Sequence, residues 1–257
     1  VPADLPERLV YSGLDDVITM SAGEWGHGFA NLQSRSAFVF LSPALAAETR
    51  LVSRYFVDHY LLNLLLTEWA MLHASCVMDP SGERLIVMIA PHNSGKSTTA
   101  LRLARAGYRF LADGMAILQM RGDQLAVGGY PIGEVKLRDD VLASFPEYGG
   151  EAVKVREHTK TVVNLRAVNS IHLAESLVVP AAIPLCFVEQ GAETKLDSLP
   201  REAARSMLAA NTVYWDTPER LAHNNAVLDH LLNVADLRRL TLGPDPARLV
   251  PVMETLR

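Results

Sequence analysis

Cysteine is nearly absent from the sequence, since only Cys76 and Cys186 occur among its 257 residues. Both lie in apolar stretches that are typical of strands, so we expect two buried thiols in a reduced compartment. Two cysteines are too few for a disulfide framework, and they follow no zinc-ligand spacing. The sequence therefore argues against a disulfide scaffold and against a zinc site.

Basic runs are absent as well. The chain carries 24 Lys and Arg residues against 29 Asp and Glu residues, which gives a formal net charge of -5. Proteins that hold nucleic acid by bulk electrostatics carry clustered positive charge. We therefore expect no nucleic-acid partner.

Long apolar runs are also lacking. The most apolar segment, residues 60–72, is interrupted by Asn63, Thr67 and Glu68, and it falls short of the about 20 residues that a membrane-spanning helix needs. The first residues do not follow the pattern of a secretory signal, in which a charged segment precedes an apolar one. We expect no membrane partner, a cytoplasmic location, and a core helix in this segment.

The overall composition is that of a globular protein with a sizeable core, because 49% of the residues are hydrophobic and 21% are charged. Residues 1–42 alternate turn signals with short β-prone runs, whereas apolar side chains recur at the helical period from 46 to 70. We expect a small N-terminal α+β appendage, residues 1–70, in which a small sheet precedes one long helix. Residues 71–257 are expected to form the core domain.

The most informative segment is Ala-Pro-His-Asn-Ser-Gly-Lys-Ser-Thr, residues 90–98. It departs from the phosphate-binding pattern G-x-x-x-x-G-K-[ST] only at its first position, where Ala90 replaces glycine. In such a loop Gly95 lets backbone amides turn toward phosphate oxygens, Lys96 neutralises phosphate charge, and Ser97 supplies a hydroxyl for Mg²⁺. The sequence therefore predicts a nucleotide phosphate site.

The flanks of the loop strengthen this prediction. An apolar run precedes the loop and a helical pattern follows it, so an anion would rest on the N-terminus of that helix. The expected nucleotide-binding residues are His92, Asn93, Ser94, Gly95, Lys96, Ser97 and Thr98.

Turn signals on both sides of the loop predict hairpins. Strands at 72–78 and 85–89 are joined by a favourable turn at 79–82, and a second hairpin spans 115–127. Hairpins mixed with one strand-loop-helix unit predict an α/β fold with a mixed sheet and helices, rather than a purely parallel array. Further strands are expected at 108–112, 162–165, 183–189 and 237–242, and further helices at 139–145, 200–210, 218–234 and 246–256.

Two more residues matter because of where these elements place them. His73 stands at the start of the hairpin that leads into the loop, and Asp113 ends the strand after the loop helix, at the sheet edge where ligands of open α/β folds gather. Alone, His73 is more typical of a hydrogen-bonded core histidine than of a catalytic one, and Asp113 is also explained as a turn residue before Gly114. Beside a nucleotide, Asp113 is suited to hold Mg²⁺ or to orient or deprotonate an attacking hydroxyl.

Together, His73, the loop at 90–98 and the segment Gly-Tyr-Arg-Phe-Leu-Ala-Asp-Gly at 107–114 resemble the catalytic domain of the HPr kinase/phosphorylase family. The resemblance covers residues 70–140 and continues weakly to the end of the chain. It implies a P-loop fold akin to phosphoenolpyruvate carboxykinase, in which ATP and Mg²⁺ serve to phosphorylate a serine hydroxyl of a peptide or small protein. It also implies a homo-oligomer.

The resemblance assigns roles by position. Asp113 matches the catalytic aspartate and His73 its partner histidine. Lys96 matches a residue that contacts phosphate, and Ser97 and Asp113 together match the residues that bind the metal. The second aspartate of the family is replaced by Gly114. The first seventy residues have no counterpart that we recognise, so we expect a divergent, stand-alone kinase of that superfamily and infer nothing about the reverse phosphorylase activity.

Three charged residues are further candidates for contacts with phosphate or substrate. Glu134 and Lys136 correspond loosely to a charged family element, and Lys136 is equally well explained as an exposed strand residue. Lys160 precedes another predicted strand within reach of a transferred phosphate, although a solvated lysine is the simpler interpretation.

Two alternatives to a peptide kinase remain open from the sequence. The acceptor of the phosphoryl group is a small metabolite in one of them. In the other, the chain binds nucleotide as a sensor or scaffold without catalysis, an interpretation that Ala90 and Gly114 favour.

Overall fold

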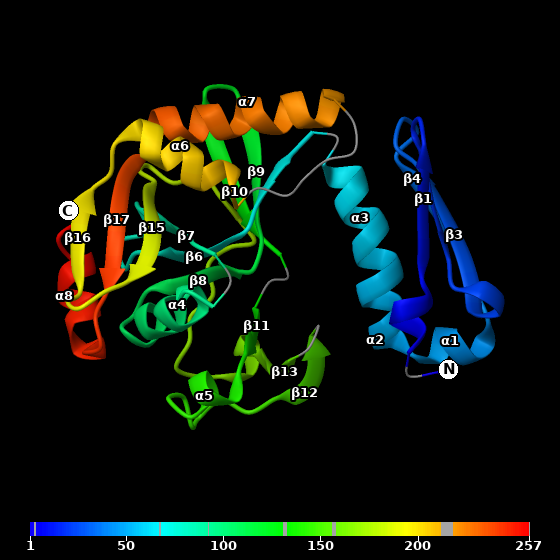
Figure 1. Ribbon diagram of the computed structural model, residues 1–257, viewed down its shortest axis with the longest axis horizontal. Coiled ribbons are helices and arrows are strands. Elements are labelled where there is room, and N and C mark those ends of the chain that lie inside the picture. Colours follow the sequence, from blue (N-terminus) through cyan, green and yellow to red (C-terminus); the bar gives the residue numbers. More distant parts are fainter. Residues whose placement is uncertain are drawn as a thin grey trace. The chain divides into compact units, whose positions relative to one another are not determined.

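The computed structural model describes residues 1–2, 4–66, 68–91, 93–130, 133–155, 158–211 and 218–256. The chain divides into two compact units, Val1–Glu68 and Trp69–Arg257 (Figure 1). Each unit is described by itself below.

The first unit contains a four-stranded antiparallel meander. Its strands follow the chain in the order β1 (Val10–Leu14), β2 (Val17–Ser21), β3 (Gly26–Asn31) and β4 (Ser36–Leu41). One face of this sheet buries Ile18, Met20 and Ala30 against Phe56 and Tyr60 of the helical segment that follows. The alternation of side chains along the strands therefore supplies one core-facing side.

Helices complete this unit. Ser42 caps α1 (Pro43–Ala47), where its hydroxyl accepts a hydrogen bond of 3.2 Å from the backbone amide of Leu45. The chain continues through α2 (Thr49–Leu51), a π-helical segment (Val52–Val57) and α3 (Asp58–Leu65). The prediction of one regular helix from 46 to 70 is wrong in two respects: the helix contains a π-helical stretch, and it ends at Leu65. Residues 70–72 pair as a strand instead, which shows tertiary pairing overriding a local helical period.

The second unit is built on a six-stranded mixed sheet. Its strand order is β16 (Lys195–Ser198), β17 (Asp236–Leu242), β15 (Pro184–Gln190), β7 (Leu85–Ile89), β6 (Ala74–Met78) and β8 (Arg109–Asp113). Strand β15 is parallel to β7 and β17, whereas β6 is antiparallel to both β7 and β8. The carboxyl ends of β7, β8, β15 and β17 therefore meet at one edge, beside the start of β6. The predicted mixed α/β sheet is confirmed.

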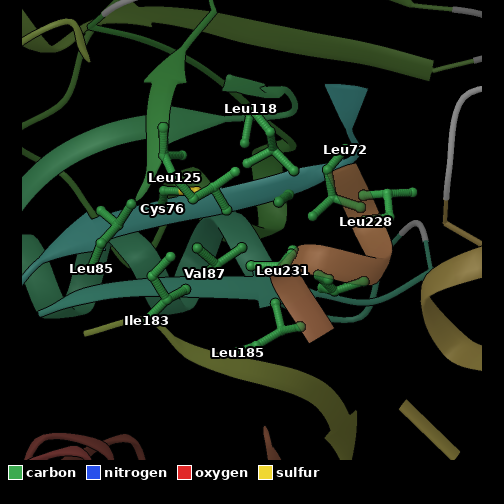
Figure 2. Packing of buried hydrophobic residues seen from close by; sticks show 14 of the residues in the cluster. Leu72, Cys76, Leu85, Val87, Leu118, Leu125, Ile183, Leu185, Leu228 and Leu231 are labelled. Carbon is green, nitrogen blue, oxygen red and sulfur yellow. The ribbon is translucent and has the colours of Figure 1, made fainter. Parts of the chain in front are cut away.

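Helices cover both faces of this sheet (Figure 1). Helices α6 (Arg201–Ala209) and α7 (Pro218–Val234) lie on one side, and α4 (Lys96–Arg105) and α8 (Leu249–Met253) lie on the other. Alternate residues of the central strands face the two helical layers, as Val87 packs toward α7 and Met88 toward α4. Figure 2 shows the first of these cores, with Leu72, Cys76, Leu85, Val87, Leu185, Leu228 and Leu231 among its members. Both cysteines are free and buried, as predicted.

Two smaller sheets flank the main one. The first has the order β14 (Leu177–Val178), β10 (Gln124–Gly129), β9 (Ala116–Arg121), β5 (Ala70–Leu72), and the second has the order β11 (Glu134–Leu137), β13 (His158–Asn164), β12 (Glu151–Val155). The short helix α5 (Asp139–Leu142) follows β11. The predicted strand 72–78 is divided at His73 between β5 and β6, because its two halves pair in different sheets.

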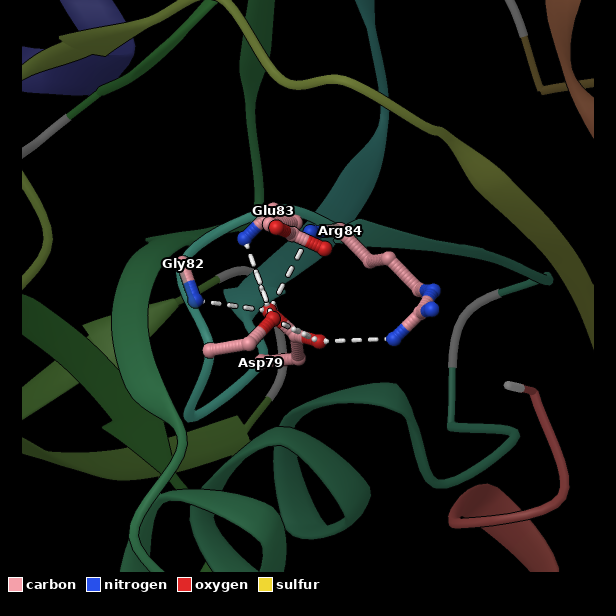
Figure 3. Close-up of polar contacts among 5 residues, drawn as sticks. Asp79, Gly82, Glu83 and Arg84 are labelled. Atoms are coloured by element: carbon pink, nitrogen blue, oxygen red, sulfur yellow. Dashed lines mark hydrogen bonds and ion pairs between the residues drawn. The ribbon is translucent and has the colours of Figure 1, made fainter.

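A tight turn closes the hairpin of β6 and β7 at the sheet edge opposite the loop (Figure 3). The Asp79 carboxylate accepts hydrogen bonds of 2.9 to 3.1 Å from the backbone amides of Gly82, Glu83 and Arg84. It also accepts a hydrogen bond from the Ser81 hydroxyl and forms an ion pair of 3.3 Å with the Arg84 guanidinium. Burial by itself would raise the pKa of Asp79, but these hydrogen bonds lower it below its usual value. The turn therefore depends on an ionised carboxylate.

Within the described residues, no helix combines the length and apolar character required to cross a bilayer.

Candidate functional site

The loop between β7 and α4 turns by means of two residues in the left-handed region. Asn93 has φ of 64° and Gly95, which caps the N-terminus of α4, has φ of 96°. Glycine tolerates this region without strain, and asparagine is one of the few other residues that do. Ala90 is not among the residues with positive φ, so the departure from glycine at this position costs no backbone strain.

The ends of two neighbouring strands hold the loop in place. The Gln190 side chain, at the end of β15, donates a hydrogen bond of 2.9 Å from Nε2 to the Ser94 carbonyl oxygen. A Cβ atom at Gly95 would lie 3.1 Å from Gln190 Nε2 and 3.1 Å from Leu242 Cδ1, which is tighter than ordinary contact. The backbone angle thus favours glycine at position 95, and an added Cβ atom would also displace the ends of these two side chains.

The Lys96 side chain turns back into the loop. Its Nζ donates hydrogen bonds of 2.6 Å to the Ala90 carbonyl oxygen and 3.0 Å to the Pro91 carbonyl oxygen. The residue is buried, and burial lowers the pKa of Lys96. The Asp113 charge opposes this shift and the Lys160 charge adds to it. The buried Lys96 ammonium therefore lies against the start of the loop that precedes α4.

Asp113 ends β8 opposite Ser75 of β6. The Ser75 hydroxyl donates a hydrogen bond of 2.5 Å to Oδ1 of Asp113, and the Ser97 side chain is a second hydrogen-bond partner. Burial raises the pKa of Asp113, and the two hydroxyls, together with the charges of Lys96 and Lys160, act against that rise. The carboxylate is thus held by two hydroxyl groups from β6 and α4 and faces two cations.

His73 lies at the junction between β5 and β6. Its Nδ1 is 2.7 Å from the carbonyl oxygen of Gly114, the residue that follows Asp113. A carbonyl oxygen can only accept, so Nδ1 is the donor and fixes the orientation of the ring. Gly114 has φ of 95°, a conformation that disfavours any residue with a Cβ atom. Glycine at 114 thus suits the local backbone, and His73 buttresses the turn after Asp113.

The remaining candidates lie on the small sheet of β11, β12 and β13. Lys160 of β13 exerts its charge on both Asp113 and Lys96, which brings it into the cluster. Glu134 and Lys136 of β11 form an ion pair with each other, with 3.6 Å between Oε1 and Nζ. Lys136 is opposite Val162, two residues from Lys160, so the two lysines share one face of the sheet.

Three other predicted nucleotide-binding residues lie in the loop or, for Thr98, in the first turn of α4. Asn93 is exposed, whereas Ser94 and Thr98 are half-buried. His92, which the sequence also places in the nucleotide site, lies outside the described residues.

Sequence reasoning did not find two residues that the geometry brings to the site. Ser75 bonds to Asp113, and Gln190 bonds to the loop. The sequence shows Ser75 only as one polar residue in an apolar strand. Its contact with Asp113 follows from the register between β6 and β8. Gln190 carried a weak signal, since it ends a strand at the same sheet edge as Asp113.

The oxygen atoms at this site suit a small, hard cation that is bound by few protein ligands. Among the described residues no group of three or more His, Cys, Asp and Glu side chains gathers as a metal site. The Asp113 carboxylate and the Ser97 hydroxyl, which are hydrogen-bond partners, are two side-chain oxygens that such a cation could use. Mg²⁺ bound with a nucleotide typically takes one or two protein oxygens and completes its shell with phosphates and water.

Comparison with known proteins gives a distant likeness at the level of structure. No protein-family model matches the sequence, and no curated protein matches it. Among solved structures, the chain is similar to the Hpr(Ser) kinase/phosphatase from Coxiella burnetii, at 10% sequence identity and a TM-score of 0.40. The alignment covers 72% of this chain and 86% of that one. This is a distant structural relationship, so the functional conclusion has to come from the loop and Asp113.

Proposed function

We propose that this chain is an ATP-dependent kinase that transfers a phosphoryl group to a serine hydroxyl of a peptide or small protein. One observation carries the proposal: the buried Lys96 ammonium and the Asp113 carboxylate interact at the N-terminus of α4, where β7, β8 and β15 end. A phosphate-binding cation and a candidate proton acceptor thus share one sheet edge.

The loop residues fit a nucleotide phosphate chain. Lys96 donates to the carbonyl oxygens of Ala90 and Pro91, so its ammonium already points into the turn that phosphate oxygens would enter. Gly95 starts α4, whose first amides and macrodipole favour an anion. In the proposal, Lys96 exchanges carbonyl oxygens for phosphate oxygens of ATP.

Asp113 and Ser97 fit Mg²⁺, which when bound with ATP neutralises charge on the phosphates. The raised pKa of Asp113 makes it a better proton acceptor than an exposed carboxylate, which suits it to orient and deprotonate an acceptor hydroxyl. Ser75 holds the carboxylate from below and His73 holds the turn that follows it. Lys160, through its charge on the same pair, would face negative charge on the transferred group.

Transfer of label from ATP tests the proposal. Wild-type chain, Lys96→Ala and Asp113→Asn are incubated with labelled ATP and Mg²⁺ and with pools of serine-containing peptides, small proteins or small metabolites. Lys195→Ala is the control, since that lysine is exposed and forms an ion pair with Asp197.

We expect the wild type and Lys195→Ala to label the peptide or protein pool, and the other two variants to fail. Labelling of small metabolites alone would favour the metabolite kinase. Equal transfer by Lys96→Ala would refute the assignment of the loop.

A non-catalytic nucleotide sensor is the second candidate. Gly114 favours it, because the position next to Asp113 carries no second carboxylate for a metal. A thermal shift with ATP but no labelling of any pool would support the sensor.

A further inference from the structure

The outer face of the sheet in the first unit has an unusual composition. Antiparallel sheets that face water on one side ordinarily alternate apolar residues inward with polar residues outward. In this meander, the outward positions include six exposed large apolar side chains: Val10, Leu14, Val17, Phe29, Phe38 and Phe40. We define these six residues as the apolar face.

Strand register places all six residues on one side. Leu14 is opposite Val17, Phe29 is opposite Phe38, and Phe40 is two residues beyond Phe38. Phe29 and Phe38 stack, with ring centroids 5.3 Å apart. Directly opposed residues of an antiparallel pair point to the same side, which is the side away from Ile18, Met20 and Ala30. Five of the six residues therefore form a diagonal apolar band across the four strands, whereas Val10 is separated from Phe40 by Ser21 and His27.

Acidic residues, lysine and arginine are absent from the same side of the sheet, where His27 is the one residue with a titratable side chain. Twelve positions of β1 to β4 point outward by register, and none of them is Asp, Glu, Lys or Arg. Proteins keep exposed sheet edges apart with charged residues, lysine above all. In a two-fold interface each residue of one copy contacts a different residue of the other copy, except on the axis itself. A face without Asp, Glu, Lys or Arg can be buried against a second copy with no formal charge left unpaired.

The size of the apolar face also fits a second copy. A phenylalanine offers roughly 200 Å², so the exposed fractions of 40%, 53% and 64% at Phe29, Phe38 and Phe40 leave about 300 Å² of aromatic surface. The three aliphatic side chains raise this toward the about 800 Å² per partner of a standard interface without reaching it. Association through this face should therefore be reversible and depend on concentration.

From these observations we propose that the apolar face is a homodimer interface, in which two copies of the chain pack their meanders face to face about a two-fold axis. The inference is independent of the kinase proposal, since it involves residues of the first unit alone.

Sedimentation velocity of the full chain over roughly 1 to 200 µM tests the inference. The wild type should shift from monomer to dimer over this range. Phe40→Lys should weaken dimerisation at least tenfold, because it replaces an aromatic residue of the interface with a charge that has no partner there. Val234→Lys is the control, because Val234 is an exposed apolar residue of α7, at 49% against 64% for Phe40, and dimerisation of this variant should equal that of the wild type.

Charge complementation tests the face-to-face geometry itself. Phe40→Lys and Phe40→Asp should each be monomeric, whereas an equimolar mixture at low salt should form heterodimers, since the Debye length there is about 30 Å and exceeds the width of the face. Circular dichroism and the melting temperature verify that both variants fold, because Phe40 lies outside the buried core.

Three results would overturn the proposal. These are a wild type that remains monomeric throughout, a Phe40→Lys variant that dimerises as the wild type does, and a mixture that associates no better than either variant alone.

Discussion

Substitution of Gly95 by alanine separates the two reasons for a glycine at the start of α4. The added Cβ atom would be strained by φ of 96° and would press on Gln190 Nε2 and Leu242 Cδ1, each 3.1 Å away. Left-handed backbone costs a residue with a Cβ atom about 1–2 kcal/mol, and forced overpacking typically adds about 1 kcal/mol or more. We expect Gly95→Ala to lower the free energy of unfolding by about 2–3 kcal/mol in total.

Gly107 provides the matched comparison. Its φ is 95°, almost the same as that of Gly95, but a Cβ atom there would meet nothing within 4 Å. Gly107→Ala should therefore lower the free energy of unfolding only through backbone strain, by about 1–2 kcal/mol. Urea unfolding of both variants measures the difference, which isolates the contact of the loop with Gln190 and Leu242.

Nucleotide binding gives the second readout for the same pair. Moving Gly95 displaces the first amides of α4, so the thermal shift caused by ATP and Mg²⁺ should shrink in Gly95→Ala and stay unchanged in Gly107→Ala. Equal destabilisation of the two variants, with full thermal shifts in both, would refute the packing of the loop described above.

Two further predictions concern the carboxylates at opposite edges of the main sheet. Asp79→Asn should cost about 2 kcal/mol of unfolding free energy at neutral pH, since hydrogen bonds to a charged group contribute about 1.5–3 kcal/mol. The pKa of Asp79 is lowered in the folded state, so this stability is present above the unfolded pKa of about 3.9 and is lost as the pH falls through the folded pKa. Plots of unfolding free energy against pH for variant and wild type should therefore converge in acid. Plots that stay parallel would exclude the ionised carboxylate. Ser75→Ala should reduce kcat for phosphoryl transfer roughly 10–100-fold with KM for ATP unchanged, because Ser75 orients Asp113 and not the loop. Ser75→Thr, which keeps the hydroxyl, should lose less, and a change confined to KM would contradict the positioning role.

Local signals predicted the part of the fold that positions the loop. The turn at Asp79 and the apolar runs on either side predicted the hairpin of β6 and β7, and Gly107 correctly marked the end of α4. These features depend on residues close together in the chain, where turn chemistry and hydrophobic period act directly. They were sufficient to place a strand, a loop and a helix in the right order.

Long-range pairing decided what local signals missed. Ala70–Leu72 continues a helical period but pairs with β9, and His73 therefore separates two strands that read as one. Strand β16 and the short strand β14 have weak patterns of their own and exist because of neighbours far along the chain. The contact between Ser75 and Asp113 follows from register between β6 and β8, which no single sequence displays.

Calorimetric titration of ATP, with and without Mg²⁺, into the wild type and Lys96→Ala tests the central claim most directly. If the buried ammonium of Lys96 and the first turn of α4 form the phosphate site, the wild type should bind ATP at one site per chain, more tightly with Mg²⁺. Lys96→Ala should then bind at least tenfold more weakly, since it loses a charged hydrogen bond to phosphate. Absence of binding by the folded wild type, or equal binding by Lys96→Ala, would contradict the account.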